Sequence, residues 1–391
     1  MHRFKLAIGW RYHAYKQAVR RYLSEVKSAV IRPFREYRQE RQLLETVRGK
    51  IPSVSSNGRA IARFKVAVIG AGSMGGHSCL GLQTLPQVEI AAVADQNPCA
   101  LERLRQLCHL SDTRCYPSVE ALLNEEVVDL VCVATNTTSH LAVARQVVAA
   151  GVRRLIVEKP IGNCVAEARD LACLCANRKV KLAVNHSRRW QSDYAAIKRC
   201  IEHGYIGTLR QVYAVPGPGG LGMIGSHFFD FTAYLSDSPL AWVIGFLDSA
   251  DRPLWQGPQF KDPGGYAVVG LQNGVRGYLD NSDDLSYKSG FVVLKGDAGR
   301  IEIDERLRQW HLDSRSLGRR TFQFIDTTDV RRYVAKVVAQ MLTDAPPPCG
   351  ATEGIAALEA VVAVHLSSSR GNVRIPLPLQ EKDAELEFPF P

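Results

Sequence analysis

The most constraining feature of the sequence is a short apolar run, residues 64–69, that ends in glycines. Three glycines follow at the spacing G-x-G-x-x-G: Gly70, Gly72 and Gly75. The pattern predicts a buried strand with a tight turn at the first glycine, close backbone approach to a diphosphate at the second, and close packing of a new helix at the third. Because helix N-termini attract anions, Ser73 and Met74 in the first helical turn are also expected to bind the diphosphate.

An acidic residue stands where the partner of a ribose hydroxyl is expected. A second apolar run, residues 88–94, ends at Asp95, 20 residues after Gly75. Gln96 follows, and no adjacent Arg is present to hold a 2′-phosphate, which favours NAD over NADP as the cofactor. A bare turn is the alternative interpretation of the glycines taken alone, because the spacing also arises by chance in glycine-rich sequence.

Strand and helix patterns alternate from residue 64 to 184 and predict a parallel sheet covered on both faces. Ligands of such sheets bind at the carboxyl ends of the strands. The candidate residues at those ends are Thr135, Asn136, His140, Glu158, Lys159, Pro160, Arg189 and Trp190. A lysine at this edge could carry a proton to or from a reacting hydroxyl. The Thr and Ser residues before residue 141 could instead only cap the next helix.

The chain of 391 residues is too long for one ordinary core, so two domains are expected. After residue 185, short β-like runs and an Asn273-Gly274 hairpin signal predict an open, mostly antiparallel sheet. The predicted fold class is α/β, with an N-terminal Rossmann doubly wound parallel sheet and a C-terminal α+β domain. The expected segments are a basic amphipathic helical extension (1–48), a linker (49–62), the Rossmann domain (63–184), a substrate and oligomerisation domain (185–378) and a loose tail (379–391).

The net charge of +10 belongs to the extension, since residues 1–50 hold 13 Lys and Arg against 4 Glu and the remainder holds 36 basic against 35 acidic residues. No nucleic-acid partner is therefore expected. An apolar stripe in the extension predicts a helix that binds an anionic membrane surface or a partner helix. Packing on the body or on a second copy, and a targeting peptide, are the alternatives.

The cysteines and the hydropathy indicate the compartment. The 10 Cys are scattered without metal-ligand spacing, which predicts buried free thiols, no metal site and a reducing compartment. No run of about 18 apolar residues is present, so no spanning helix is expected. We therefore expect a cytoplasmic location, with peripheral attachment to a membrane through the basic extension as a further possibility.

The glycine turn, Asp95, the Glu158-Lys159-Pro160 sequence and the Arg189-Trp190 pair resemble the Gfo/Idh/MocA oxidoreductase family, which includes glucose-fructose oxidoreductase and inositol 2-dehydrogenase. The resemblance covers about residues 63–378. It implies an NAD or NADP cofactor and a catalytic role for Lys159. It also implies a homo-oligomer that forms through the C-terminal sheet.

His227 lies on a helix expected to start near Ile224, after a glycine-rich loop. Spacing alone favours a packed or capping histidine, whereas the resemblance implies a catalytic one that acts with Lys159. Family members commonly carry Asp four residues before this His, but this chain has Met223 there. Asp230 is the nearest acid by sequence, and a capping or orienting role is equally open to it.

The sequence thus predicts an NAD(P)-dependent oxidoreductase that transfers a hydride between nicotinamide and a secondary alcohol of a sugar, cyclitol or nucleotide sugar. Met223 motivates a second hypothesis, a cofactor-binding sensor or assembly partner without turnover. A third hypothesis is a redox-neutral enzyme that holds NAD tightly.

Overall fold

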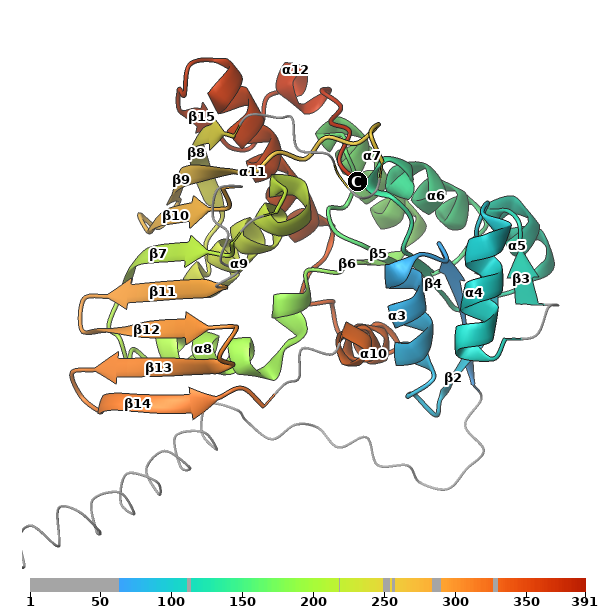
Figure 1. Cartoon of the computed structure of the whole chain (residues 1–391), viewed down its shortest axis with the longest axis horizontal. Helices are drawn as coiled ribbons and strands as arrows, with labels where there is room; N and C mark the ends of the chain where they lie inside the picture. Colours follow the sequence, from blue (N-terminus) through green and yellow to red (C-terminus); the bar gives the residue numbers. More distant parts are fainter. Residues whose placement is uncertain are drawn as a thin grey trace, which may run out of the picture. The chain divides into compact units, whose positions relative to one another are not determined.

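The computed structural model describes residues 63–110, 114–217, 219–248, 254, 257–282, 290–325 and 330–391. The expected extension, 1–48, and linker, 49–62, lie outside the described residues. The described part contains two sheets with helices packed against both (Figure 1). Within it, no helix is both long and apolar enough to cross a bilayer.

The first sheet has six parallel strands in the order β3-β2-β1-β4-β5-β6. This order places the switch point between β1 and β4, where doubly wound sheets bind their ligands. The strands are β1 (Phe64–Ile69), β2 (Val88–Ala94), β3 (Cys115–Tyr116), β4 (Leu130–Val133), β5 (Arg154–Val157) and β6 (Lys181–Val184). Their side chains are almost entirely buried, because helices cover both faces. The predicted Rossmann sheet is confirmed.

Two of the five helices that cover this sheet begin at a side-chain cap, and one begins at the glycine turn. Asn97 accepts hydrogen bonds from the amides of Cys99 and Ala100 at the start of α4, and Ser118 accepts one from Ala121 at the start of α5. The five helices are α3 (Ser73–Leu82), α4 (Pro98–Cys108), α5 (Val119–Glu125), α6 (Thr137–Ala149) and α7 (Val165–Arg178).

The second sheet has nine strands in the order β14-β13-β12-β11-β7-β10-β9-β8-β15. In this order β7 and β10 pair in parallel and every other neighbouring pair is antiparallel, which confirms the predicted mostly antiparallel sheet. The strands are β7 (Leu209–Val215), β8 (Leu240–Leu247), β9 (Gly265–Leu271), β10 (Arg276–Asp280), β11 (Phe291–Gly296), β12 (Gly299–Asp304), β13 (Gln309–Ser314), β14 (Gly318–Gln323) and β15 (Ile375–Pro376). Strands β13 and β14 were not expected from the sequence, because their residues are largely polar.

Helices α9 (Ser226–Ser236) and α11 (Ala351–Ser369) pack on one face of the second sheet (Figure 1). The packing is close, since a Cβ atom added at Gly245 would lie 2.6 Å from the Cα atom of Val364. Three further helical segments are η3 (Ser187–Trp190), α8 (Ser192–Glu202) and the π-helical turn η4 (Leu221–Gly225).

Helix α10 (Val330–Met341) returns from the second sheet to the first and packs against α3. A Cβ atom added at Gly81 of α3 would lie 2.4 Å from the carbonyl oxygen of Arg331. Two basic side chains of the first sheet hold the other end of α10: Arg154 Nε donates to the Met341 carbonyl at 3.1 Å and Lys181 Nζ to the Gln340 carbonyl at 3.1 Å. Residues far along the chain therefore complete the cover of the first sheet.

Residues 379–391 are packed, although the sequence analysis expected a loose tail. Helix α12 (Glu381–Ala384) is followed by residues that bond to the body: the Phe388 amide donates to the Asn163 carbonyl at 3.0 Å, and the Lys261 amide donates to the Pro389 carbonyl at 2.8 Å. Phe390 is fully buried. Burial of its aromatic ring accounts for the ordered path of this segment.

The contact between α3 and α10 gives a testable prediction. Gly81→Ala should lower the free energy of unfolding by about 1–3 kcal/mol, because the added methyl group meets the Arg331 carbonyl. Helix propensity alone would stabilise the variant by about 1 kcal/mol. The melting temperatures of the Gly81→Ala variant and the parent, measured by calorimetry, show which effect is larger.

Gly76→Ala is the matched control on the same helix. Its Cβ atom would lie 3.5 Å from a Leu107 methyl carbon, an ordinary contact, so the variant should be as stable as the parent or more stable. Equal melting temperatures for the Gly81→Ala variant and the parent would contradict the described packing.

Candidate functional site

The three glycines of the first turn have three different surroundings. Gly70 has φ +104°, and a Cβ atom there would lie 2.4 Å from the carbonyl oxygen of Ala134, the residue that follows β4. A Cβ atom at Gly75 would lie 1.8 Å from the Gly70 carbonyl oxygen. At Gly72 nothing lies within 4 Å of an added Cβ atom. The backbone before α3 is thus open on one side, as close approach of a diphosphate requires.

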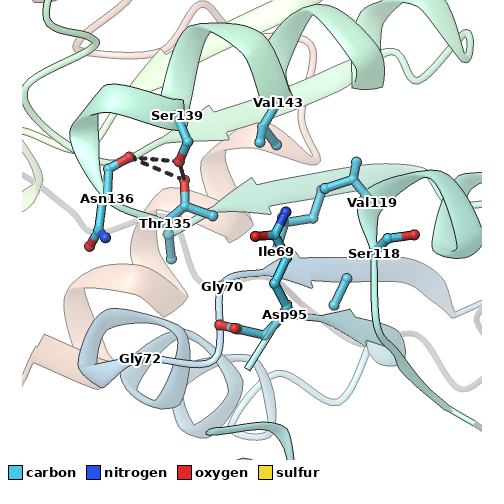
Figure 2. A pocket seen from close by; sticks show the side chains of 13 residues that line it. Ile69, Gly70, Gly72, Asp95, Ser118, Val119, Thr135, Asn136, Ser139 and Val143 are labelled. Carbon is cyan, nitrogen blue, oxygen red and sulfur yellow. Dashed lines mark hydrogen bonds between the residues drawn. The ribbon is translucent and has the colours of Figure 1, made fainter. Parts of the chain in front are cut away.

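A cavity of about 270 Å³ lies beside this turn, at the carboxyl ends of β1, β2 and β4 (Figure 2). Asp95 lines it, and the Asp95 carboxylate accepts the amide of Ala71 at 2.6 Å and the amide of Asn97 at 2.7 Å. These bonds fix the carboxylate and leave further lone pairs for hydroxyl groups of a ligand. Gln96 also lines the cavity, whereas neither Lys nor Arg does so among the described residues.

The loop after β4 forms the wall opposite Asp95. The Ser139 hydroxyl lies 2.8 Å from the Thr135 hydroxyl and 2.9 Å from the Asn136 carbonyl oxygen, to which it donates (Figure 2). His140 lies behind this loop, with Nδ1 2.9 Å from the Pro160 carbonyl oxygen and Nε2 3.0 Å from the Thr135 carbonyl oxygen. Burial lowers the pKa of His140 to about 4, and because a neutral imidazole carries one N–H, it donates to one of these two carbonyl oxygens and only lies close to the other.

A larger cavity, of about 550 Å³, shares Gly72, Thr135 and Asn136 with the first. The predicted residues that line it are Gly72, Ser73, Met74, Thr135, Asn136, His140, Glu158, Lys159 and His227. The fold therefore brings the diphosphate turn, the lysine after β5 and the histidine of α9 to one space. Further lining residues, which the sequence analysis missed, are Asn185, Ser187, Val330, Tyr333 and Pro391.

Lys159 directs its ammonium group toward η4, where Nζ donates to the Met223 carbonyl oxygen at 2.7 Å. Burial lowers the pKa of Lys159, and the carboxylates of Glu158 and Asp262 oppose that shift. Glu158 is itself buried, which raises its pKa, and it accepts a hydrogen bond from Asn185 Nδ2 at 2.6 Å. The lysine amine is thus more readily deprotonated than an exposed one. The peptide bond between Lys159 and Pro160 is cis.

Two histidines meet beside this lysine. The rings of His186 and His227 are edge to face with centroids 5.4 Å apart. Burial and then the charge of Lys159 hold the pKa of His227 well below its usual range, and burial lowers the pKa of His186 to about 4. Both imidazoles are therefore neutral near pH 7. Nδ1 of His227 is buried and has no hydrogen-bond partner among the described residues, so it can bind a ligand hydroxyl.

Asp262, another residue that the sequence analysis missed, lies beneath the turn that carries Met223. Its side chain is 2% exposed and accepts the amides of Gly222 at 2.7 Å and Met223 at 2.9 Å. No sequence signal marks it, because 39 residues separate it from Met223.

Arg189, Trp190 and Asp230 lie away from both cavities. Arg189 Nε lies 2.9 Å from Asp230 Oδ1, and the guanidinium covers the ring of Tyr234 at 4.9 Å. Asp230 is therefore paired with Arg189, and Trp190 is buried in the protein. The roles in cofactor binding expected for Arg189 and Trp190 remain predictions that the lining of these cavities does not support.

The last described residue also reaches the larger cavity. Pro391 lines it, and the Thr137 hydroxyl at the start of α6 donates to the Pro391 carbonyl oxygen. Phe390 packs against Gly222, where an added Cβ atom would lie 3.0 Å from the ring. The only sequence signal for this wall is the aromatic composition of residues 388–390.

Residues 64–186 match the family model GFO_IDH_MocA, described as an oxidoreductase family with an NAD-binding Rossmann fold. Over 156 residues the chain is 31% identical to D-apiose dehydrogenase of Paraburkholderia graminis, a match that spans 40% of each chain. Over 240 residues it is 28% identical to the rhizopine catabolism protein MocA of Rhizobium meliloti, a match that spans 60% of this chain and 72% of that protein.

The fold extends beyond the family-model match. A solved structure of levoglucosan dehydrogenase, in complex with NADH and levoglucosan, superposes with a TM-score of 0.70 over 81% of this chain and 100% of that one, at 17% identity. This likeness shows the same fold in both sheets. The family description also confirms the expected nicotinamide dinucleotide as the cofactor class. Residues 64–186, which carry the glycine turn, Glu158 and Lys159, thus match the Gfo/Idh/MocA oxidoreductase family, and the likeness in fold extends over both sheets.

Proposed function

We propose that the chain is an NAD-dependent oxidoreductase that transfers a hydride between nicotinamide and a secondary alcohol of a sugar, cyclitol or nucleotide sugar. The observation that carries this proposal is the cavity that contains both the open diphosphate turn at Gly72 and the ammonium group of Lys159. The names of related proteins, D-apiose dehydrogenase and levoglucosan dehydrogenase among them, support a polyhydroxylated substrate.

The residues of the cavity are suited to proton transfer at a hydroxyl group. When bound, NAD accepts the hydride that leaves the alcohol carbon. The hydroxyl proton goes to the Lys159 amine, so the alcohol becomes a ketone and the lysine becomes an ammonium ion. Neutral His227 orients the hydroxyl by a hydrogen bond. In the opposite direction the ammonium form of Lys159 returns the proton.

Lys159→Met should lower kcat for alcohol oxidation by about 100- to 10,000-fold, because the group that accepts the proton is lost. Affinity for NADH, measured by quenching of protein fluorescence, should stay near that of the parent. In the parent, the oxidation rate should rise with pH as Lys159 deprotonates, with a midpoint below the ordinary lysine pKa of 10.5.

Lys198→Met is the control for that variant, since Lys198 pairs with Asp237 outside the cavity and its loss should leave kcat unchanged. Full turnover by the Lys159→Met variant would overturn the assigned role.

Two other outcomes would favour the alternative functions. If the protein binds NADH but no polyol reduces NAD, the result favours a cofactor-binding sensor or assembly partner, the hypothesis that the absence of an acid at Met223 suggested. NAD retained through purification, with no net redox change of the substrate, would favour the redox-neutral enzyme.

The preference for NAD over NADP rests on Asp95. Its fixed carboxylate lines the smaller cavity, where an acidic group accepts ribose hydroxyls and repels a 2′-phosphate. Basic side chains that would hold a phosphate are absent from that lining within the described part of the chain.

Asp95→Ala should weaken NADH binding about 10- to 100-fold, the value of a hydrogen bond to a charged group, and should narrow the difference between NADH and NADPH. Asp129→Ala is a suitable control, because Asp129 also accepts a backbone amide, that of Lys65 at 2.8 Å, but does not line the cavity. Isothermal titration calorimetry with NAD, NADH, NADP and NADPH measures these affinities. An unchanged ratio of NADH to NADPH affinity in the Asp95→Ala variant would contradict the role of Asp95.

We also propose that the open face of the second sheet forms a homo-oligomer. This face carries a row of aromatic rings, with Tyr213 stacked on Tyr278 at 5.1 Å and Phe246 on Tyr266 at 4.5 Å. Tyr213 is 43% exposed. Contiguous exposed aromatic surface of this kind is typical of protein interfaces.

Tyr213→Glu should shift the protein toward the monomer in analytical ultracentrifugation, because the charge would be buried in the interface. Leu107→Glu changes an apolar side chain of α4 that is 54% exposed, and it should leave the oligomeric state unchanged. A parent protein that is monomeric at micromolar concentration would rule out this interface.

The cellular location remains a proposal as well. Each of the ten cysteines is a free thiol, which supports a reducing compartment such as the cytoplasm. Attachment to an anionic membrane surface or a partner helix through residues 1–48 rests on the charge and periodicity of that segment alone.

A further inference from the structure

We propose that Asp262 is the positioning residue of the catalytic lysine: it holds Lys159 through the backbone of Met223 and supplies the acidic charge that position 223 lacks. This inference rests on the proposed function of Lys159 as the group that exchanges a proton with the substrate. Asp230, the nearest acid to His227 by sequence, is paired with Arg189 instead.

A chain of hydrogen bonds connects the two side chains. The Asp262 carboxylate accepts the amides of Gly222 at 2.7 Å and Met223 at 2.9 Å, and the carbonyl of Met223 accepts Lys159 Nζ at 2.7 Å. The carboxylate therefore fixes the orientation of a residue whose carbonyl oxygen fixes the ammonium group. The side chain of Met223 takes no part in this chain, so the absence of an acid at position 223 does not break it.

The glycines of the turn make room for this carboxylate. A Cβ atom at Gly220 would lie 1.8 Å from Asp262 Oδ2, and one at Gly222 would lie 3.2 Å from Asp262 Oδ1. The backbone on each side of Asp262 is also held, since the Pro263 carbonyl accepts the Leu221 amide at 3.0 Å and the Lys261 amide donates to the Pro389 carbonyl at 2.8 Å. The π-helical turn is thus shaped around a buried acid, and π-helical turns are frequent at functional sites.

The charges around Lys159 explain why a second carboxylate matters. Burial and the guanidinium of Arg188 lower the pKa of Lys159, whereas Glu158 and Asp262 raise it. The neighbouring imidazoles of His140, His186 and His227 are neutral, and Arg188 is itself paired with Glu305. Loss of the Asp262 charge would therefore leave Glu158 alone to stabilise the ammonium form.

The test is the pH profile of the Asp262→Asn variant in alcohol oxidation. The limb assigned to Lys159 should move to lower pH by about 1 unit or more, because an opposite charge close to the amine is lost. kcat at the pH optimum should fall about 10- to 100-fold, since the amine is no longer held in place. Asp262→Glu keeps the charge but not the hydrogen-bond geometry, so its kcat should fall while the limb stays where it is in the parent.

A direct titration makes the test independent of activity. Lysines methylated with a ¹³C label are followed by NMR against pH, and the Lys159 signal is identified by its loss in the Lys159→Arg variant. Its pKa should be lower in the Asp262→Asn variant than in the parent. Asp297→Asn is the matched control, because Asp297 accepts the Thr208 amide at 2.9 Å but is not among the residues of either cavity, so the Lys159 titration should not change.

Should the Asp262→Asn variant not fold, Gly220→Ala displaces the same carboxylate by its methyl group and should shift the titration in the same direction. An unshifted Lys159 titration and pH limb in a folded variant would overturn the proposal and leave Asp262 with a purely structural role. This failure is distinct from that of the proposed function, which would appear as full turnover by the Lys159→Met variant.

Discussion

The arrangement of the larger cavity depends on the stabilisation of one ammonium group between two sheets. Removing a lysine amine from water is costly, and here the cost is offset by a carbonyl oxygen at 2.7 Å and by two nearby carboxylates. One of these acids follows β5 directly, while the other comes from the loop before β9. The lysine is therefore held by both halves of the protein, and neither sheet alone would present it in this state.

The same dependence on distant residues extends around the cavity. Helix α10 covers α3, which begins at the diphosphate turn, and Tyr333 of α10 lines the space where Lys159 lies. Residues 388–391 close another side, with Phe390 packed against the turn that Asp262 supports. Because residues that follow strands of both sheets line the cavity, its shape depends on how the two sheets and their helices pack together.

The sequence predicted the elements whose signals are local. Each of these signals reflects a local backbone conformation: the glycine spacing, the polar residues at the strand ends and the Asn-Gly turn. The structure contains the predicted parallel and antiparallel sheets. Proximity along the chain and apolar patterns carried less information. Asp230 lies three residues from His227, yet it pairs with Arg189, and the polar strands β13 and β14 gave no apolar signal at all.

By itself the sequence determined the dinucleotide turn and the match of residues 64–186 to an NAD-binding oxidoreductase family, because Gly70, Gly72 and Gly75 act through the backbone and the Asp95 carboxylate accepts a backbone amide of the same turn. It also placed Lys159 at the carboxyl end of a strand of the parallel sheet. Only the tertiary structure decided which acid accompanies that lysine, that Met223 contributes its carbonyl oxygen, and that residues 379–391 form part of the body. Those outcomes depend on burial and on contacts between residues far apart in the chain, and such contacts leave no periodic pattern in a single sequence.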